Sequence, residues 1–392
     1  MKRLKLVIIV TLLALIPYSV KAQKAPPPQD SVEISLLTCT PGQQIWAQFG
    51  HTAIRVHDLR TGDDIAVNYG MFSSDQPYFV MRFIFGLTDY KMDVEPFNVF
   101  VSEYAYEGRG IIEQKLDISG MDKARILAAL QKNILPENQV YRYNFFYDNC
   151  TTRARDIIVN NLGSSVQYPA AKQDSCSFRY YVHRANKDYP WIRFGEDLLL
   201  GLPADYKTNK SEQQFLPDNL RADFEKTLYN GKPLVSSSRV ILQPVEQAES
   251  KTSTPTPLDV IIILCIVTVI IEYIEYKKGV IFWGLDLFYM LLTGLPGIII
   301  FAMLFSQHPT VSLNLLILFL NPIPLLFAYP AVMRTRRHRK FFWWTLWEIL
   351  IVLGMIGGFF QTYPSEMLLL ALLLLTRPLM HHYRQREISR KK

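Results

Sequence analysis

Three blocks with different hydrophobic patterns follow one another along the chain. A short apolar run comes first, from Leu6 to Ile16, directly after a cluster of basic residues. From about residue 30 to residue 238, short alternating runs, helical periods and polar turns succeed each other, as in a folded domain. Beyond residue 257, long apolar stretches are separated by short polar connections. The pattern predicts a leader, a folded domain and a membrane domain.

Residues 1–22 have the order of segments that is typical of a secretory signal peptide. Lys2, Arg3 and Lys5 precede the apolar run, and residues 20–22 form the expected cleavage region. An uncleaved N-terminal anchor is the alternative, although the run is shorter than the ~20 residues that span a bilayer. In both cases we expect the following residues to lie outside the cytoplasm.

The apolar stretches beyond residue 257 predict an all-α membrane domain at 258–383, followed by a cytoplasmic tail at 384–392. We expect five spans, at about 258–276, 280–305, 311–333, 341–360 and 364–383. The connections at 277–278 and 334–340 carry Lys and Arg, as does the tail, whereas 306–310 and 361–364 carry neither. The positive-inside rule then places the N-terminal domain in the periplasm of a bacterial inner-membrane protein.

The net charge of +7 does not indicate a nucleic-acid-binding protein. The leader carries four basic residues and no acidic one, and the chain from residue 257 carries 13 basic against 7 acidic residues. Residues 23–256 hold 25 basic and 28 acidic residues, so the folded domain is mildly acidic and no nucleic-acid partner is expected. The positive charge instead reflects membrane topology.

The composition of residues 239–257 predicts a linker between the two domains. This segment is rich in Ser, Thr, Pro and charged residues, which do not form a hydrophobic core. The folded extracytoplasmic domain is therefore expected at 23–238. Four cysteines in the whole chain exclude a disulfide-dense scaffold for it.

Cys150 has the most informative surroundings of these cysteines. Residues 141–147 form an aromatic run typical of a strand, and Asp148 and Asn149 can cap a helix that begins at Cys150. A thiol in the first helical turn feels the positive end of the helix dipole, which lowers its pKa and favours the nucleophilic thiolate. Free amides of the same turn can stabilise an oxyanion. A buried structural cysteine is the alternative.

A thiol nucleophile needs a base, and His51 is the candidate. It lies in a β-prone run, 49–56, directly after Gly50, which allows another backbone to approach closely. A turn at 59–64 leads into a second strand, in which Asn68 returns close to His51 and can orient the imidazole. A strand histidine without a catalytic role is the alternative.

The motifs FGHTAIRV, NYG and YRYNFFYDNCTTRARD, with LLTCTPG before them, resemble the extracytoplasmic domain of Bacteroides-type lipoprotein N-acyltransferases. The order of His before Cys is also similar to the permuted papain-like fold of the lecithin:retinol acyltransferase group. The resemblance covers nearly the whole chain, because the family also has a multi-span C-terminal membrane domain.

This resemblance implies an α+β, papain-like domain with an antiparallel sheet, joined to an all-α domain of five transmembrane helices. It also implies that Cys150 is the nucleophile and that His51 is the general base and acid. Asn68 as a third catalytic residue is our geometric inference, because that position is often His in the wider fold.

Other polar residues are candidates for substrate contacts. The candidates are Tyr69, Arg55, Asn149 and His308. Arg55 can engage a phosphate or be a solvated surface charge. His308 lies in an extracytoplasmic connection and can contact a lipid head group, although helix capping in this segment explains it nearly as well. No Cys or His pair has metal-ligand spacing, so we expect neither a metal nor a cofactor.

The remaining cysteines and the charges in the spans leave alternatives open. Cys39 and Cys176 can form a disulfide in an oxidising periplasm, or Cys39 can line the cleft. Acidic residues in the spans are functional candidates, but an interhelical pair with Arg377 is the simpler interpretation.

Together these observations favour a membrane-anchored thiol acyltransferase. Cys150 would take a fatty acyl chain from a phospholipid donor and, by resemblance, pass it to the N-terminal amine of a diacylated lipoprotein. A membrane-tethered cysteine hydrolase acting on a peptide, an amide or a lipid ester is the first alternative. A non-enzymatic membrane binding or transport protein is the second, although the spans show no internal repeat.

Overall fold

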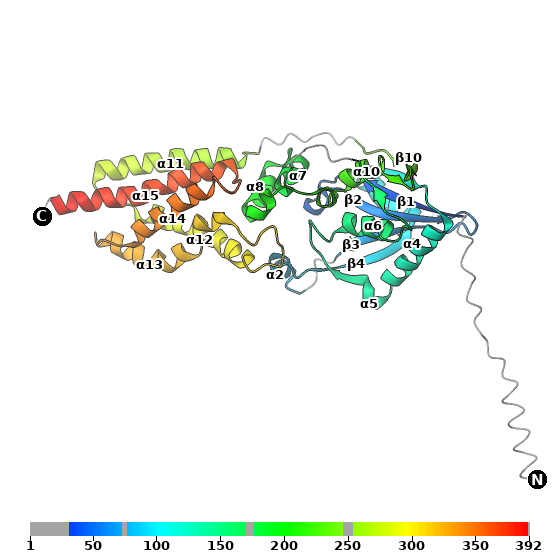
Figure 1. Cartoon of the computed structure of the whole chain (residues 1–392). Coiled ribbons are helices and arrows are strands. Elements are labelled where there is room, and N and C mark those ends of the chain that lie inside the picture. The colour runs from blue at the N-terminus through cyan, green and yellow to red at the C-terminus, as the bar shows by residue number, and fades with distance from the viewer. Residues whose placement is uncertain (1–30, 73–76, 170–175, 246–253, 391–392) are drawn as a thin grey trace, which may run out of the picture.

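The computed structural model describes residues 31–72, 77–169, 176–245 and 254–390 (Figure 1). The predicted signal peptide, residues 1–22, lies outside these residues, as does the 246–253 part of the predicted linker. An α+β domain occupies one end of an elongated molecule, and a bundle of long helices occupies the other (Figure 1). The fold class predicted from the sequence, an α+β domain joined to an all-α membrane domain, is confirmed.

A seven-stranded sheet forms the centre of the α+β domain. Its strands are β1 (Val32–Cys39), β2 (His51–Asp58), β3 (Asp64–Met71), β4 (Asp89–Pro96), β5 (Ile111–Leu116), β6 (Val140–Arg142) and β10 (Val235–Leu242). They lie in the order β10-β5-β1-β2-β3-β4-β6, and every neighbouring pair is antiparallel. Because β10 pairs with β5 as far as Leu242, the folded domain extends past residue 238, where the linker was expected to begin.

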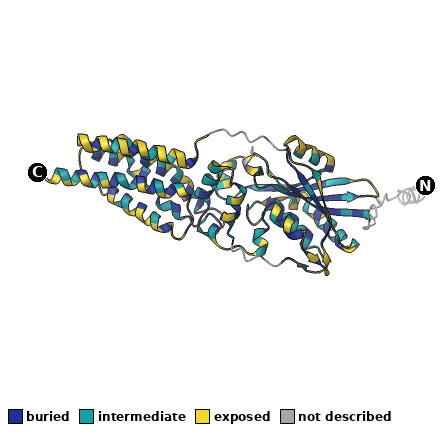
Figure 2. Cartoon of the chain, turned by 90° about the horizontal axis from the view of Figure 1, so that it is seen from above, coloured by how far each residue is buried: buried dark blue, intermediate teal, exposed yellow. Residues whose placement is uncertain are grey.

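Helices cover both faces of this sheet, which explains why β1 is buried at almost every position (Figure 2). α4 (Gly120–Asn133), α6 (Cys150–Val159) and α10 (Pro217–Phe224) pack on one face, against a core that includes Leu36. α3 (Phe97–Tyr106) packs on the other face, over Leu37.

Short elements complete the α+β domain. They are η2 (Ile45–Ala47), α2 (Phe79–Ile84), α5 (Pro136–Gln139), β7 (Val166–Gln167), α7 (Phe178–Ala185), α8 (Pro190–Leu199), η3 (Leu202–Asp205), α9 (Lys210–Gln213), β8 (Leu228–Tyr229) and β9 (Lys232–Pro233). β7, β8 and β9 form a second, three-stranded sheet. α7 and α8 lie between the main sheet and the membrane helices, next to an aromatic cluster of Phe146, Phe178, Tyr181 and Phe215 (Figure 1).

The C-terminal bundle has helices in each of the five regions that were predicted to span the membrane. They are α11 (Pro257–Lys278), α12 (Trp283–Met303), α13 (Ile323–Arg336) with the preceding η4 (Leu315–Leu318), α14 (Trp343–Gly357) and α15 (Ser365–Arg390). By length and composition, 257–278, 283–303 and 315–336 are long and apolar enough to cross a membrane, and α14 is a shorter apolar helix. Because α15 continues to Arg390, most of the predicted cytoplasmic tail is helical.

The third predicted span is not one continuous α-helix. The sequence pattern predicts a span at 311–333, but the chain forms only η4 and turns before α13 begins. Pro322 has no backbone N–H with which to continue a helix. The side chains of Asn314 and Asn321 instead accept hydrogen bonds from nearby backbone amides, at 3.0 and 3.1 Å. Polar side chains therefore satisfy the backbone where the helix is interrupted.

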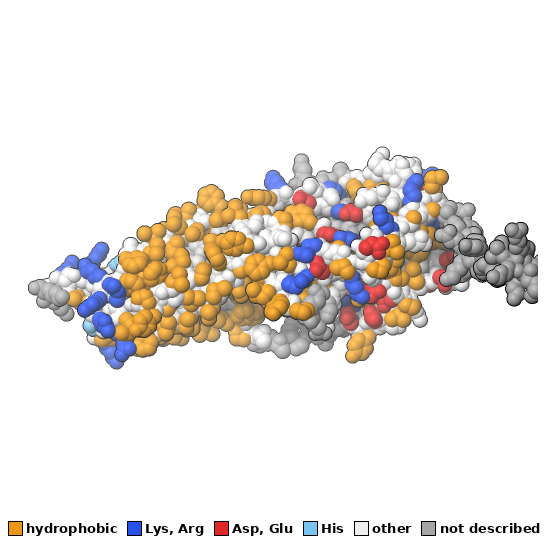
Figure 3. All heavy atoms as spheres, turned by 90° about the horizontal axis from the view of Figure 1, so that it is seen from below, with side chains coloured by type: hydrophobic (Ala, Val, Ile, Leu, Met, Phe, Trp, Pro, Cys, Tyr) orange, Lys and Arg blue, Asp and Glu red, His pale blue; other side chains and the backbone are white. Residues whose placement is uncertain are grey.

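Basic side chains gather at the end of the bundle that is remote from the α+β domain (Figure 3). Arg336 lies over the ring of Trp283, and Arg384 donates to the carbonyls of Glu275 and Tyr276. The basic connection after α13 and the C-terminal helix therefore meet the ends of α11 and α12 there. Hydrophobic side chains cover the surface between this basic end and the α+β domain, which agrees with the positive-inside topology (Figure 3).

A buried ionic cluster joins α11, α12 and α15 inside the bundle. Arg377 lies 2.7 Å from Glu275, 3.2 Å from Glu272 and 2.8 Å from Asp286. Charges in hydrocarbon are costly unless they are paired. The interhelical pairing expected for Arg377 is confirmed, and its acidic partners on α11 and α12 neutralise it.

Hydrogen bonds as well as the linker join the α+β domain to the membrane helices. The segment after α8 bonds to the two outer connections of the bundle: Gly201 N to Thr310 O (2.9 Å), Leu202 N to Leu313 O (2.7 Å), Asn314 Nδ2 to Leu198 O (2.8 Å) and Gln361 Nε2 to Leu200 O (3.2 Å). A Cβ at position 201 would lie 2.4 Å from Leu313 O, so this approach requires glycine. The two domains are thus held in one relative position.

Arg179 holds this junction segment from the side of the α+β domain. Its side chain is 2% exposed and makes ion pairs of 2.7 Å with both Asp197 and Asp205. It also donates to the carbonyls of Leu200 and Gly201, at 2.9 and 3.2 Å. These partners compensate for the desolvation of the buried guanidinium. Removing the guanidinium would leave buried acceptors with fewer hydrogen-bond partners.

We expect Arg179→Ala to destabilise the full-length protein by about 3–5 kcal/mol, because the buried carboxylate of Asp197 and the partly buried carboxylate of Asp205 lose the guanidinium that pairs with both. The midpoint of thermal denaturation in detergent measures this effect. Arg142→Ala is the matched control, since Arg142 pairs with Asp89 at 2.9 Å while its side chain is 45% exposed. That change should cost about 1 kcal/mol or less. Equal midpoints for the two variants would show that Arg179 does not hold the junction.

Candidate active site

Cys150 is the first residue of α6, and Asn149 is its N-cap. The Oδ1 of Asn149 accepts hydrogen bonds from the amides of Thr151 and Thr152, each at 2.9 Å. Its Nδ2 donates to two backbone carbonyls, at 2.8 and 2.9 Å. Asn149 was a candidate for substrate binding, but it is buried and both of its polar atoms are used to hold the start of the helix. Its role is to position Cys150.

Two glycines with positive φ allow the strands to approach the site. Gly50 has φ +77°, and a Cβ there would lie 2.7 Å from the carbonyl oxygen of Cys39, as expected for a close backbone approach. Gly70 has φ +88°, and a Cβ there would lie 3.6 Å from the Cβ of Cys150. Glycine is the residue that adopts these conformations without strain. The start of β2 and the end of β3 therefore lie beside the thiol.

His51 and Cys150 interact electrostatically where β2 meets α6. Burial alone would raise the pKa of the Cys150 thiol. The charge of His51, its hydrogen bond and the backbone amide of Thr52 outweigh burial and lower this pKa to about 7. Burial alone would lower the pKa of His51, but the Cys150 charge and hydrogen bonds to Cys150 and Asn68 raise it. Both shifts favour a thiolate–imidazolium pair near neutral pH.

Asn68 lies on the other side of the His51 ring. Its Oδ1 is 3.1 Å from His51 Nε2, which leaves Nδ1 of the ring for the thiol. Asn68 is opposite Ala53 in the β2–β3 register, so it faces the same side of the sheet as His51. The structure thus brings together the three residues that were predicted to be catalytic.

Glu95 extends this row of side chains and was not predicted from the sequence. Asn68 Nδ2 donates to Glu95 Oε1 at 2.5 Å, so the carboxylate orients the amide that contacts His51. Burial and the charges of Glu103 and Asp93 raise the pKa of Glu95. In the sequence, Glu95 is marked only by its place in an alternating, strand-like segment. An exposed Glu without any role in a site would occupy the same kind of position.

Two other candidates for substrate binding have structural roles. Tyr69 is fully buried in the core, where its hydroxyl lies 3.4 Å from Asn133 Oδ1. Arg55 pairs with Asp64 at 2.7 Å and with Glu113 at 2.9 Å. Neither side chain therefore presents an unpaired polar group to a substrate.

His308 lies in the connection after α12, where it contacts α2. Its ring centroid is 6.2 Å from that of Phe83, and its imidazole bonds to the Phe83 carbonyl. A Cβ on Gly86 would lie 3.2 Å from His308, so the two segments are in close contact. His308 therefore attaches α2 to the membrane domain.

All four cysteines, each of which lies in the described part of the chain, are free thiols, so Cys39 and Cys176 do not form a disulfide. Cys39 is buried next to Tyr104, and burial raises the pKa of its thiol to about 12. Cys176 packs against the aromatic cluster of α7. Cys39 is therefore protonated at neutral pH.

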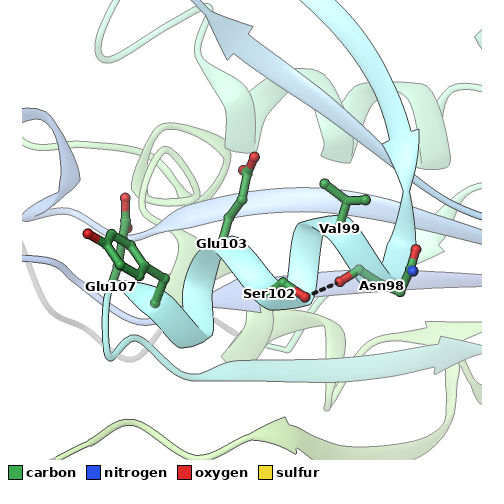
Figure 4. Close-up of a pocket in the computed structure, with 6 residues that line it drawn as sticks. Asn98, Val99, Ser102, Glu103 and Glu107 are labelled. Carbon is green, nitrogen blue, oxygen red and sulfur yellow. Dashed lines mark hydrogen bonds between the residues drawn. The ribbon is translucent and has the colours of Figure 1, made fainter.

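A surface hollow lies along the outer side of α3 (Figure 4). It is lined by Asn98, Val99, Ser102, Glu103, Tyr106 and Glu107. None of the predicted site residues lines it, and the bond from Ser102 to the Asn98 carbonyl lies within the helix. The hollow is thus a solvated helix face beside the site.

We expect alkylation of Cys150 by iodoacetamide to rise with pH around a midpoint near 7. In His51→Ala the thiolate loses its counter-charge while burial remains, so this midpoint should move above the ordinary thiol value of 9.0. Mass spectrometry of the peptide that contains Cys150 measures the rate, and Cys150→Ser shows the background. A midpoint that His51→Ala leaves unchanged would exclude the ion pair.

Comparison with protein families assigns both parts of the chain. A model described as the Lnb N-terminal periplasmic domain matches residues 20–181, and a model described as the Lnb transmembrane domain matches residues 248–387. No curated protein and no solved structure matches the chain. The matched ranges include His51, Asn68 and Cys150 as well as α11 to α14. The chain therefore belongs to the Bacteroides-type lipoprotein N-acyltransferase (Lnb) family, whose members combine a periplasmic domain with a transmembrane domain.

Proposed function

We propose that this protein moves a fatty acyl chain from a phospholipid donor to the N-terminal amine of diacylated lipoproteins, through a thioester on Cys150. The observation that carries the proposal is the pairing of Cys150 with His51, which lowers the pKa of the thiol to about 7. Family membership supports the reaction class, and the attachment to membrane helices supports a lipid substrate. The enzyme is thus a membrane-anchored thiol acyltransferase.

In the first half-reaction, the Cys150 thiolate attacks the ester carbonyl of the phospholipid. The C–S bond forms, the bond between the carbonyl carbon and the alkoxyl oxygen breaks, and protonated His51 gives its proton to the departing lysophospholipid oxygen. Asn68 holds the imidazole during this transfer, because it bonds the other ring nitrogen at 3.1 Å.

In the second half-reaction, the lipoprotein amine attacks the thioester carbonyl. The C–N bond forms and the C–S bond breaks, while His51 accepts the proton that the amine loses. The products are the amide and the Cys150 thiolate beside protonated His51, which is the starting state.

The oxyanion that develops in both steps faces the start of α6. Asn149 occupies the amides of Thr151 and Thr152, so the amide of Cys150 itself is the first-turn donor that this arrangement assigns to the oxyanion. The positive end of the α6 dipole adds to its stabilisation.

Cys150→Ala and His51→Ala should each abolish N-acylation of lipoproteins, because one removes the nucleophile and the other its base. Mass spectrometry of lipoprotein N-termini would then show diacylated forms alone. Cys176→Ser is the matched control and should leave triacylation intact, since Cys176 lies outside the dyad. Full triacylation in Cys150→Ala contradicts the proposal, and release of free fatty acid without acceptor would instead indicate a hydrolase.

Asn68→Ala should lower kcat by about 10²-fold, because the imidazole loses the group that orients it. Glu95→Gln keeps an acceptor for Asn68 and should lower kcat by less than about tenfold. The rate of thioester formation in a single turnover measures both effects. If Asn68→Ala reacts as fast as the unaltered protein, Asn68 has no part in catalysis.

A further inference from the structure

α2 presents an apolar surface at the membrane end of the α+β domain. We define the α2 patch as Tyr78, Val80, Met81 and Phe83, whose exposed fractions are 82%, 68%, 53% and 43%. No residue of this six-residue helix is buried. Such a concentration of exposed apolar side chains is unfavourable in water and typically marks a contact surface.

Contacts with the membrane domain determine where the α2 patch lies relative to the membrane helices. α2 packs beside α12 (Figure 1), and the amide of Gln307 donates to the carbonyl of Phe85 at 3.0 Å. The end of α12 and the residues after it also expose apolar side chains, with Phe301 at 46% and Phe305 at 67%. The α2 patch therefore continues the lipid-facing surface of α12 at the periplasmic end of that helix.

A row of stacked rings leads from α2 to the nucleophile. We define the aromatic row as Phe79, Phe72, Tyr90 and Tyr143, with successive centroid distances of 5.7, 4.9 and 4.0 Å and nearly parallel planes. A Cβ at Gly70 would lie 4.0 Å from Tyr90 and 3.6 Å from the Cβ of Cys150, so Tyr90 and Cys150 both lie next to Gly70. Tyr90, Phe72, Tyr143 and Cys150 also share one hydrophobic cluster.

We propose that the α2 patch and the aromatic row bind the acyl chain of the lipid donor and guide it from the outer leaflet to Cys150. This inference rests on the proposed function and adds the residues that recognise the chain. An acyl chain is the occupant that fits, because the α2 patch is continuous with a lipid-facing helix and the aromatic row belongs to the same apolar cluster as Cys150. In this arrangement the donor ester lies at Cys150 while its chain remains in an apolar environment.

The test is the double variant Val80→Ser with Met81→Ser, in full-length protein reconstituted into phosphatidylethanolamine vesicles without lipoprotein acceptor. Loss of two apolar contacts should slow acyl-thioester formation on Cys150 about tenfold. Dihexanoyl phospholipid added from solution has chains too short to reach α2, so the double variant should use it as fast as the unaltered protein does. Intact-protein mass spectrometry follows the thioester.

Val240→Ser with Met121→Ser is the matched control, since these side chains are 50% and 69% exposed on β10 and α4. It should react like the unaltered protein with both lipids. Alkylation of Cys150 by iodoacetamide should be the same in all proteins, which shows that the dyad is intact.

The outcomes separate this inference from the proposed function. If the unaltered protein forms no thioester with either lipid, the proposed function itself is wrong. If it does, and the α2 variant forms the thioester from long-chain lipid at the same rate, only the role of the α2 patch is wrong. If thioester formation is unchanged but the α2 variant acylates a lipoprotein acceptor more slowly when the acceptor is added in a second step, the inference is also overturned, because the α2 patch would then bind the acceptor.

Discussion

The buried guanidinium of Arg179 holds the junction segment through which the α+β domain is attached to the membrane helices. It pairs with Asp197 and Asp205 and bonds to the carbonyls of the junction segment, whose own backbone bonds to the outer connections of the bundle. A buried charge needs an ion-pair or hydrogen-bond partner for each of its polar atoms. The junction segment supplies these partners, so it has little freedom to adopt another arrangement. Because the junction is held, the α+β domain keeps one distance and orientation relative to the membrane helices.

The same dependence on neighbours governs the site. Thr52 and Thr151, 99 positions apart, are joined by a hydroxyl–hydroxyl bond of 3.0 Å next to His51 and Cys150. This bond links β2 to the first turn of α6, and Asn149 secures that turn from within. The thiolate is favoured because the charge of His51, the backbone amide of Thr52 and the side chain of Thr151 compensate for its burial. A small displacement of α6 relative to β2 would leave burial without that compensation, and the thiol would then remain protonated.

Single residues show where prediction from the sequence succeeded and where it stopped. The cap signal before Cys150 and the strand–turn–strand pattern that returns Asn68 to His51 are local, so their geometry could be predicted from spacing. Asn149, Tyr69 and Arg55 were predicted to bind substrate from their place in or beside motifs. Asn149 is the helix cap that the local sequence also indicated. Tyr69 is a core residue and Arg55 belongs to a buried ion pair, and the sequence did not reveal these two roles because partners such as Asn133 and Glu113 lie far away in the sequence. Glu95 escaped prediction for the same reason, and the third span was expected to be a continuous helix because hydropathy does not register the polar side chains that replace its backbone bonds.

The sequence by itself determined the order of domains, the orientation in the membrane and the identity of Cys150 and His51 as a candidate pair. These properties follow from hydrophobic length, the distribution of charge and short motifs, all of which act locally along the chain. The tertiary structure alone decided which thiol lies beside a histidine, which polar groups are already occupied and how the aromatic row is stacked between α2 and the core. Each of these depends on contacts between segments distant in the sequence, and the free energy of a charged or polar group is set by what surrounds it after folding.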